Sequence, residues 1–568
     1  MAPSGKRARR NILFIMFDQL RFDYLSCAGH PTLDTPHIDR LASMGVRFTN
    51  AYVQSPVCGS SRMSFYTGRY VHSHGAQWNG VPLKVGEYTL GDHMRARGLD
   101  AVLVGKTHMR VDRDGMARLG LERDTLIGAR VAECGFDVWV RDDGLWPEGP
   151  DGQYDEGARS PYNAYLNGLG YEGDNPWHDF ANSAVTDEGE IASGWFLGNS
   201  RKPANIEEEH SETPWLTRET IAFMESRGDG DRPWLCHASY IKPHWPYIVP
   251  APYHDRYGGA DVQPAIRSAG EREDAHPVHA AFMDNVVGRA YARDGVRETV
   301  IPAYMALIKQ CDDQMGVLFD YLERSGRMED TMIVLTSDHG DYLGDHWCGE
   351  KGFVHDVSAK VPMIVYDPSP EADATRGTVC DALVESIDLA ATFTDWTAGD
   401  VPDHIIEGRS LLPWLHGETP DGWRDFALIE YDYSMTPMRE AVGVEVKDAR
   451  LFALFDGRFK FIHFEGERDG APIRPMLFDL ASDPHELEDL ARDPNAHGEL
   501  VAEMMAKLGR WARRLSQRFT LSDDQIRAMT GKSRRRGVVL GAVDESDVPP
   551  ELTVKYRGPA PKRPDPQG

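Results

Sequence analysis

Short apolar runs bounded by turn residues alternate with helical patterns over most of the chain. The runs are rich in Val, Ile and Leu and lack polar alternation, which is typical of strands that are covered on both faces. Their alternation with helices predicts an α/β fold, a large mixed and mostly parallel sheet sandwiched by helices. The predicted strands are Ile12–Phe17, Ala101–Val104, Trp234–Ala238, Met332–Thr336 and Met363–Tyr366, and the predicted helices are Ile38–Met44, Leu90–Arg97, Thr217–Ser226 and Tyr304–Arg324.

The pattern changes near Gly408. Short strands of antiparallel type follow, with Asp456-Gly457 as a hairpin turn and a helix over His497–Ser516. We therefore expect a smaller C-terminal α+β domain with an antiparallel sheet. Its predicted strands are Ala427–Tyr431, Leu451–Phe455, Phe459–Phe464 and Leu477–Leu480.

These patterns predict four regions: a basic N-terminal tail (1–10), a catalytic domain (11–408), a C-terminal α+β subdomain (409–520) and an extension (521–568). Residues 134–215 are rich in Gly, Asp, Trp and Pro with weak periodicity, so we expect an insertion near the working face. We expect this insertion and the C-terminal segments to line the pocket mouth. The polar extension contains the basic run Lys532–Arg536, and we expect it to pack on a sister subunit.

Composition narrows the choice of partners. The 568 residues include 62 Lys and Arg against 89 Asp and Glu, a net charge of −27, which argues against nucleic acid and anionic membranes as partners. Apolar residues make up 41%, enough for a large core, and no apolar run reaches the roughly 18 residues of a membrane span. The seven cysteines are scattered and odd in number, which indicates a reducing compartment, the cytoplasm.

Two predicted strands deliver a carboxylate at their carboxyl ends, where ligands gather in a parallel sheet. NILFIMF leads into Asp18-Gln19, and MIVLTS leads into Asp338-His339. Two carboxylates with an amide and an imidazole suit one divalent cation. The alternative is that SDHGD is simply a turn, but two such ends favour the metal site.

A second group of candidate catalytic residues surrounds Cys58, in the segment SPVCGSSRMSFYTGR. Pro56 and Gly59 predict a chain reversal, and Ser61–Thr67 predicts a short helix. A thiol at a helix N-terminus has a lowered pKa, and Arg62 adds a cation one turn on. The alternative is a buried structural cysteine, the common fate of a free thiol.

Cationic groups follow other strand ends, in Gly105-Lys106-Thr107-His108 and in Lys242-Pro243-His244, and Lys351 lies shortly after Asp338. A single such residue is most often a surface group. Together they place one cationic pocket in an acidic chain, which indicates a tetrahedral oxyanion ester as the small-molecule substrate.

With these motifs the sequence resembles the type I sulfatases of the alkaline phosphatase superfamily, in the arylsulfatase and phosphonate monoester hydrolase branch. The resemblance extends from NILFIMFDQLR to LFDLASDPHELEDLARDP and implies an alkaline-phosphatase-like fold and a homodimer or homotetramer. The motifs that carry it are DTPHIDRLASMGVRFTNAY, CGSSRMSFYTGRY, GKTHM, KPHWPY, TSDHGDYLGDHW with GEKG, SIDLAATF and GRSLLPWL.

The resemblance implies a role for each residue. Cys58 would be oxidised to formylglycine (3-oxoalanine) by a formylglycine-generating enzyme, and the hydrate would supply the nucleophilic oxygen. Arg62 would fix that hydrate, and His108 would take the proton of its second hydroxyl. The metal ligands would be Asp18, Gln19, Cys58, Asp338 and His339, and the substrate contacts would be Asn79, Lys106, His244 and Lys351, the last two also protonating the leaving group.

The sequence departs from the family in three places. Position 60 is Ser, where the modification signal has Pro or Ala. Gln19 and His339 match the phosphonate monoester hydrolases, and the imidazole shifts the metal preference from Ca²⁺ towards Mn²⁺. Lys106 and His108, by contrast, match the sulfatases.

Four functions remain open on the sequence. The leading one is a formylglycine-dependent sulfate monoester hydrolase of arylsulfatase type, with promiscuity towards phosphonate monoesters and phosphodiesters. The runner-up makes phosphonate monoester or phosphodiester hydrolysis the main activity. The others are a two-metal phosphatase with unmodified Cys58 and further ligands from His346 or His355, and a non-catalytic binding protein.

Overall fold

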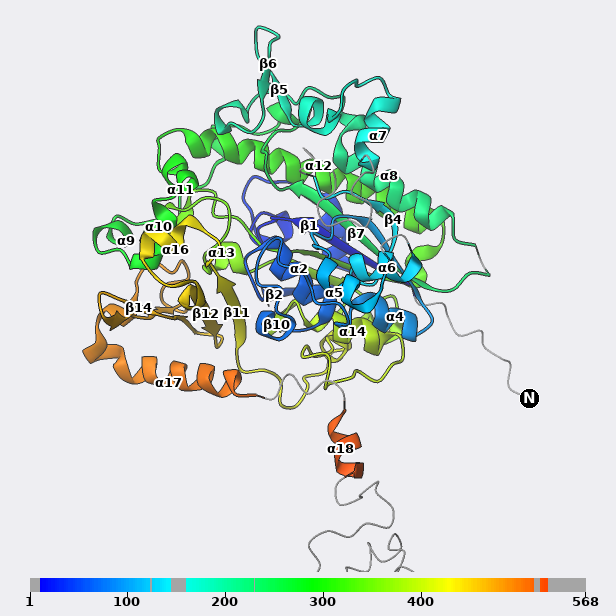
Figure 1. Ribbon diagram of the computed structural model, residues 1–568. Helices are drawn as coiled ribbons and strands as arrows, with labels where there is room; N and C mark the ends of the chain where they lie inside the picture. The colour runs from blue at the N-terminus through cyan, green and yellow to red at the C-terminus, as the bar shows by residue number, and fades with distance from the viewer. Residues whose placement is uncertain (1–10, 123–124, 145–159, 229, 515–520, 530–568) are drawn as a thin grey trace, which may run out of the picture. The chain divides into compact units, whose positions relative to one another are not determined.

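Eight strands form one large sheet in the computed structural model, which describes residues 11–122, 125–144, 160–228, 230–514 and 521–529 (Figure 1). The strand order is β10-β2-β9-β8-β1-β7-β3-β4, and β9 alone runs antiparallel to its neighbours. The predicted mixed, mostly parallel sheet is therefore confirmed. Its strands are β1 (Asn11–Asp18), β2 (Val46–Tyr52), β3 (Asp100–Gly105), β4 (Asp137–Arg141), β7 (Trp234–Pro243), β8 (Thr331–Ser337), β9 (Met363–Tyr366) and β10 (Thr378–Glu385).

The strand β1 shows why the sheet carries helices on both sides. Its side chains alternate between two separate hydrophobic clusters, with Leu13 and Ile15 in one and Ile12 and Phe14 in the other, and none of them is exposed. Because successive residues of a strand point to opposite faces, an unbroken apolar run needs cover above and below.

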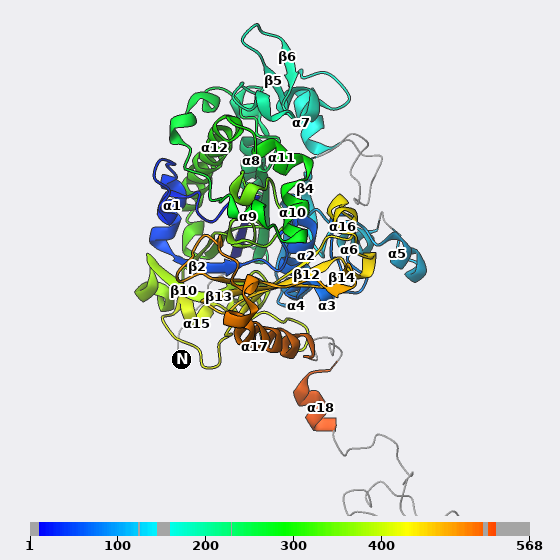
Figure 2. The same cartoon turned by 90° about the vertical axis from the view of Figure 1, so that its left-hand side faces the viewer.

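Helices supply that cover in two layers (Figures 1 and 2). The helix α12 (Val296–Arg324) packs with α8 (Glu212–Glu225) and α1 (Pro36–Met44) into the cluster of Leu13 and Ile15. On the other face α2 (Cys58–Thr67), α4 (Leu90–Ala96) and α14 (Asp388–Trp396) pack into the cluster of Ile12 and Phe14. The long helix α12 contains the predicted helix Tyr304–Arg324 and begins two turns earlier.

A second, antiparallel sheet follows the first, in the order β11-β12-β13-β16. Leu428, Phe461 and Leu477 on one face pack against Met504 and Leu508 of a C-terminal helix, whereas the other face joins the core beside the large sheet. The predicted antiparallel sheet is confirmed. Its elements are β11 (Ala427–Asp432), β12 (Arg450–Phe455), β13 (Phe459–Phe464), β16 (Met476–Asp479) and the helix α17 (Pro494–Ala512).

Residues 134–215, expected to be an insertion, begin with the edge strand β4 of the large sheet. Their described remainder forms the helix α7 (Pro161–Gly168) and the hairpin of β5 (Ser183–Val185) and β6 (Ile191–Ser193). The other short elements are α3 (Val71–His74), α5 (Arg113–Leu119), α6 (Leu126–Ala132), α9 (Gly270–Glu273), α10 (Pro277–Met283), α11 (Val286–Tyr291), α13 (Asp356–Ala359), α15 (Leu412–Leu415), α16 (Pro437–Val442), β14 (Glu467–Arg468) and β15 (Ala471–Pro472).

The described residues of 11–401 and 406–514 cluster into one unit by their contacts, and the boundary expected near 408 stays a prediction. The helix α18 (Asp523–Met529) belongs to a second unit, and the predicted basic tail 1–10 and the run Lys532–Arg536 lie outside the described residues. Among the described helices, none combines the length and the apolar character that crossing a membrane requires.

Candidate active site

The ends of two neighbouring parallel strands bring two carboxylates together. In the register of β1 and β8, Phe17 pairs with Ser337, so Asp18 and Asp338 leave the sheet side by side, and both are fully buried. The backbone N–H of Gln19 donates to Asp338 Oδ1 over 3.0 Å. Burial and the neighbouring Asp18 raise the pKa of Asp338, as expected for two carboxylates that share one site.

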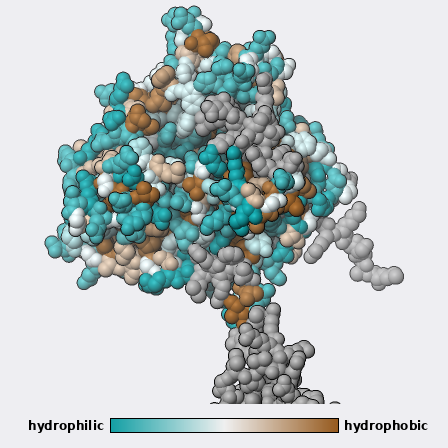
Figure 3. Space-filling model, in the orientation of Figure 1, coloured by the Kyte–Doolittle hydropathy of each residue, from teal (hydrophilic) through white to brown (hydrophobic). Residues whose placement is uncertain are grey.

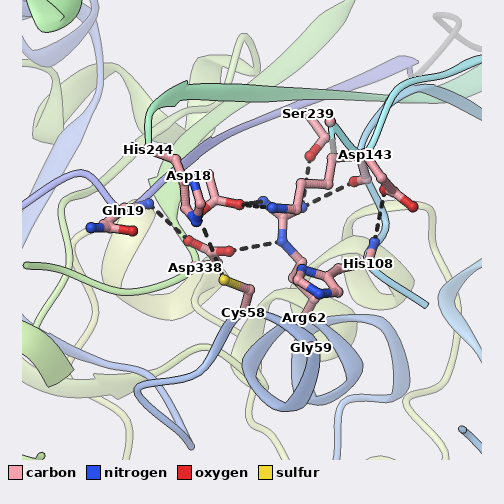
Figure 4. A network of polar contacts seen from close by, with 12 residues as sticks. Asp18, Gln19, Cys58, Gly59, Arg62, His108, Asp143, Ser239, His244 and Asp338 are labelled. Carbon is pink, nitrogen blue, oxygen red and sulfur yellow. Dashed lines mark hydrogen bonds and ion pairs between the residues drawn. The ribbon is translucent and has the colours of Figure 1, made fainter. Parts of the chain in front are cut away.

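The thiol of Cys58 faces these carboxylates from the first residue of α2 (Figure 4). Its Sγ lies 3.1 Å from His339 Nε2, 3.8 Å from Asp18 Oδ1 and 3.0 Å from Lys351 Nζ. Burial alone would raise the pKa of this thiol, but Lys351, His339 and Lys106 lower it well below its ordinary value. These neighbours are typical of a reactive thiol and fit an inert structural cysteine poorly, and the catalytic role of Cys58 stays a prediction.

The first turn of α2 packs closely against Asn79. Gly59 donates its backbone N–H to Asn79 Oδ1 over 2.7 Å, and a Cβ at Gly59 would come within 2.8 Å of the same oxygen. Asn79, predicted as a substrate contact, thus also fixes the backbone beside Cys58.

Arg62 joins the carboxylates and the surrounding strands (Figure 4). Its Nε donates to Asp338 Oδ2 over 2.8 Å and its Nη2 to Asp18 Oδ2 over 3.1 Å. Its Nη1 donates to Ser239 Oγ over 2.7 Å and to the backbone carbonyl of Lys106 over 3.0 Å. Since the guanidinium is fully buried and every nitrogen is engaged, it holds these groups in a fixed geometry.

Three further cationic or imidazole groups surround the thiol. Lys106 Nζ lies 2.6 Å from Asp18 Oδ2, and Lys351 Nζ lies 3.1 Å from His244 Nε2. Burial and the nearby Lys351 lower the pKa of His244 to about 3, which keeps its imidazole neutral. Burial acts against the charge of Lys351, but Cys58 and Asp18 outweigh it and raise its pKa.

A clamp from the end of β4 holds the loop that carries Lys106 and His108. Asp143 Oδ1 accepts the backbone N–H groups of Thr107 and His108, each over 3.1 Å, and Arg141 pairs with Asp143. His108 has a φ of 55° and a buried Nδ1 without a hydrogen-bond partner in the described part of the chain. The clamp therefore fixes a strained residue next to the thiol.

Gln19, predicted as a ligand, lies beside the cluster with its amide already oriented. Its Nε2 donates to Asp341 Oδ2 over 2.5 Å and to the Tyr247 hydroxyl over 3.1 Å, and its Oε1 accepts from Lys351 Nζ over 3.4 Å. The carbonyl oxygen, the end that binds cations, is thus on the side of Lys351 and Cys58.

The donor set fits a divalent cation. Among the described residues, Asp18, Cys58, Asp338 and His339 offer one ligand atom each within 4.8 Å of one another, and all four are buried. Two buried carboxylates with an imidazole are an oxygen and nitrogen set that binds such ions. His346 and His355, considered for a second metal, instead stack on each other and contact Glu271 and Tyr342.

A cavity of about 530 Å³ opens above the thiol. Lys106, His108, His244 and Lys351 are among the residues that line it. Two distant parts of the chain complete its wall, the segment with Trp177 and Trp195 and the segment Tyr431–Met438 after β11.

The structure brings every predicted site residue into this one region, and it adds partners that were not predicted. Ser239, Asp143, Asp341 and Tyr247 each hold one of the predicted residues. Asp341 and Tyr247 lie within the motifs TSDHGDYLGDHW and KPHWPY, so the sequence contained a signal for both. Ser239 and Asp143 lie outside the motifs.

Two family models match the chain. The Sulfatase family matches residues 10–399, and the C-terminal model of N-sulphoglucosamine sulphohydrolase matches residues 344–514. Among curated relatives, the multifunctional alkaline phosphatase superfamily protein PehA of Trinickia caryophylli is 30% identical, covering 89% of this chain and 95% of its own. The arylsulfatase of Clostridium perfringens is 28% identical, covering 84% and 90%.

Solved structures are similar as well. The phosphonate monoester hydrolase SpPMH from Silicibacter pomeroyi superposes with a TM-score of 0.78 at 27% identity, covering 91% of this chain and 98% of the other. The phosphonate monoester hydrolase of Agrobacterium radiobacter gives 0.72 at 26% identity, covering 88% and 95%.

Proposed function

We propose, because the chain belongs to the sulfatase family, that it hydrolyses sulfate monoesters of arylsulfatase type and also accepts phosphonate monoesters and phosphodiesters. The observation that carries this proposal is the position of Cys58. The thiol begins a buried helix and lies within hydrogen-bonding distance of His339 and Lys351, beside Asp18. No other thiol among the described residues faces a cluster of this kind.

The bound groups would supply two things when present: a divalent ion, Mn²⁺ or Ca²⁺, would neutralise the oxyanion, and formylglycine at position 58 would offer a hydrated aldehyde as nucleophile. The ion would be held by Asp18, Gln19, Asp338, His339 and the modified Cys58.

The protein's own side chains bind and orient the ester. Lys106 and Lys351 present their ammonium groups on two sides of position 58 and bind the oxyanion, and Asn79 lines the same cavity. Arg62 lies one turn beyond position 58 on α2 and donates one hydrogen bond to each carboxylate, so it anchors the helix that carries position 58 beside them.

Proton transfer is divided between two sides of the site. His108 lines the cavity beside Lys106 and helps to lower the pKa of the Cys58 thiol, so we place it as the group that accepts a proton at position 58. On the other side the neutral His244 and the charged Lys351 lie 3.1 Å apart. This pair gives one proton to the leaving oxygen and regains it from solvent after the product has left.

The second candidate function makes phosphonate monoester or phosphodiester hydrolysis the main activity. Gln19 and His339 favour it, as does the likeness to two phosphonate monoester hydrolases. Lys106 and His108 favour the sulfatase.

A comparison of kcat/KM on 4-nitrophenyl sulfate and on the 4-nitrophenyl ester of phenylphosphonate separates the two functions. The chain is co-expressed with a formylglycine-generating enzyme and loaded with Mn²⁺. We expect the sulfate to be the better substrate, and a higher value for the phosphonate would reverse the order. Chelation should abolish both activities, and parallel reloading with Mn²⁺ and Ca²⁺ identifies the working ion.

The same proposal covers how the enzyme is modified, how its subunits assemble and where in the cell it acts. The formylglycine-generating enzyme is its transient partner, and a homodimer or homotetramer with the extension 521–568 at the contact is its assembly. All seven cysteines are free thiols, which supports a cytoplasmic location. Size-exclusion chromatography with light scattering on the full chain tests the assembly.

A further inference from the structure

Four donor atoms at Cys58 are spaced like the ligands of a single small ion. The Cys58 Sγ lies 3.1 Å from His339 Nε2 and 3.8 Å from Asp18 Oδ1. The same imidazole nitrogen lies 3.8 Å from Asp18 Oδ1 and 3.7 Å from Asp338 Oδ1. Ligand atoms bonded at about 2.0–2.3 Å to a tetrahedral ion lie about 3.3–3.6 Å from one another. The unmodified sulfur is therefore close enough to the other three atoms to be the fourth ligand of one ion.

The other hydrogen bonds of these side chains leave the donor atoms available. Arg62 donates to the Oδ2 atoms of Asp18 and Asp338, so the Oδ1 atoms remain on the side of His339. The backbone N–H of Gln19 uses one of the two lone pairs of Asp338 Oδ1. His339 Nδ1 lies 2.8 Å from the carbonyl oxygen of Gly340, which can only accept, so a neutral imidazole carries its proton on Nδ1 and has a lone pair on Nε2.

A cysteine sulfur changes the ion that this set of ligands prefers. Formylglycine would offer an oxygen, which suits Mn²⁺ or Ca²⁺, whereas a thiolate is a soft ligand that favours Zn²⁺. Zinc sites with four protein ligands are closed, because no position is left for a substrate. Lys351 Nζ, 3.0 Å from Sγ, can donate a hydrogen bond to a metal-bound thiolate and offset its charge.

We propose that the chain with an unmodified Cys58 binds one Zn²⁺ in a closed site that has no room for an ester. Its four ligands are Asp18, Cys58, Asp338 and His339. The pocket thus holds two different ions, Zn²⁺ before the modification and the catalytic ion after it. Because zinc binds before the modification, this site does not depend on which ester the modified enzyme hydrolyses.

Other groups on the chain also attract cations, so a test has to detect the sulfur ligand itself. The net charge is −27, and Figure 3 shows that most of the face drawn there is hydrophilic, so exposed carboxylates can bind ions weakly. A second cluster among the described residues, His37, Asp312 and Asp313, offers no sulfur, and Lys309 already pairs with both of its carboxylates. Cys58 is the one described cysteine that belongs to such a cluster.

Co²⁺ is the probe for this site, because it replaces Zn²⁺ and reports its ligands in its spectrum. The full chain is produced without a formylglycine-generating enzyme, shown by mass spectrometry to carry the intact thiol, stripped with a chelator and titrated with Co²⁺. We expect one tightly bound Co²⁺ per chain, with the intense visible bands of a tetrahedral site and a thiolate-to-cobalt charge-transfer band in the near ultraviolet. Zn²⁺ should displace it and abolish both signals. A bound Co²⁺ without the charge-transfer band would overturn the proposal.

Substitution of the cysteine shows whether Cys58 supplies the sulfur. Cys58→Ala, or Cys58→Ser if the alanine variant does not fold, should lose the charge-transfer band and bind Zn²⁺ about 100-fold or more weakly. Its affinity for Mn²⁺ should fall by much less, since a hard ion gains little from a sulfur ligand. Cys236→Ala is the matched control, because Cys236 is equally buried but belongs to the apolar core on β7. In folded preparations, checked by their Tm, a band that the Cys58 variants keep would overturn the proposal.

The converted protein keeps this result separate from the proposed function. Co²⁺ bound to the formylglycine form should show no thiolate band. A thiolate band in the unmodified chain together with a converted protein that hydrolyses no ester would support the zinc site and refute the hydrolase. An active converted protein whose unmodified form gives no thiolate band would refute the zinc site alone.

Discussion

Ser60, the residue at which the modification signal departs from the family, lies on the first turn of α2 and is fully buried. Its hydroxyl finds no hydrogen-bond partner among the described residues. A buried hydroxyl without a partner costs more than the smaller apolar side chain in its place. We therefore expect Ser60→Ala to stabilise the fold by about 1 kcal/mol, measured as a higher Tm in calorimetry.

Ser64 on the same helix is the matched control. Its hydroxyl lies 3.0 Å from His74 Nε2 and is buried as well, so Ser64→Ala should lower the Tm. If both substitutions changed the Tm in the same direction, the stated cost of the Ser60 hydroxyl would be wrong.

A substitution of Arg62 can separate the effect of the shape of its side chain from the effect of its charge. Lysine in its place keeps the charge but lacks the planar fork whose separate nitrogens reach Asp18, Asp338 and Ser239. We expect Arg62→Lys to lower kcat by about 100-fold or more, with a smaller change in KM. Metal content is measured on the same preparation. A variant that keeps the wild-type kcat and a full metal content would contradict the role of the planar Arg62 guanidinium.

At the level of single residues, the sequence predicts the candidate catalytic and metal-binding residues better than the residues that hold them in place through hydrogen bonds. Asp18, Cys58 and Asp338 follow strand ends or start a helix, and such places have recognisable patterns. Ser239 lies one residue beyond the predicted strand Trp234–Ala238, in the part that β7 adds. Asp341 lies within the motif TSDHGDYLGDHW, but nothing in the motif shows that it holds Gln19. Their partners are set by the register of the sheet, which one chain's pattern does not reveal.

At the level of elements, the buried central strands are predicted well and the edge regions are not. The edge strand β10 and its neighbour β2 were not predicted, because polar residues interrupt both and neither forms a continuous apolar run. The strand β4 was assigned to an insertion for the same reason, since only two of its five residues are buried. Edge strands have one free side and need fewer apolar residues, so the burial pattern weakens there.

The clamp at the end of β4 gives a prediction for the loop that follows β3. Asp143→Ala removes the acceptor for the N–H groups of Thr107 and His108, so we expect His108 to lose its position and kcat to fall by about 100-fold. Asp143→Asn keeps one carbonyl oxygen and should restore at least about tenfold of that loss.

A control variant shows whether the fall in kcat comes from the lost position of His108 or from general damage to the fold. Asp137→Ala serves as the control, since Asp137 lies at the start of β4 and pairs with Arg130 of the helix α6 rather than with the loop. Equal losses for Asp143→Ala and Asp143→Asn would show that the acceptor is not what matters, as would an equal loss in the control.

At the level of the whole molecule, buried Glu133 links stability to pH. Burial raises its pKa to about 7, and Arg141, its ion-pair partner, does not fully offset this. Between its ordinary value near 4.5 and about 7 the folded chain keeps a proton that the unfolded chain has lost. The stability this group contributes is therefore present below about pH 4.5 and is lost as the pH rises to 7, by up to about 3 kcal/mol.

Glu133→Gln should remove this loss. We expect the Tm of the variant relative to wild type to increase between pH 4.5 and 7.5, and Glu440→Gln, which alters an exposed side chain, to run parallel to wild type. Parallel curves for Glu133→Gln would contradict the raised pKa.

The site as a whole is assembled from strand ends and loops that lie far apart in the sequence. The motifs indicate that Cys58, Asp338 and Lys351 belong to one chemistry, and the sheet order brings them within a few ångström of one another. The cavity wall was beyond prediction in detail, because its residues come from 177–195 and 431–438, where no periodic pattern points inward. Which of these residues face the cavity depends on how distant segments of the chain pack together.

The central claim is that Cys58 becomes an aldehyde beside the carboxylate cluster. The most direct test is mass spectrometry of the peptide that contains Cys58, taken from active protein made together with a formylglycine-generating enzyme. The account predicts the mass of formylglycine and its adduct with hydroxylamine, in proportion to the specific activity of each preparation. A fully active preparation in which Cys58 is an intact thiol throughout would contradict it.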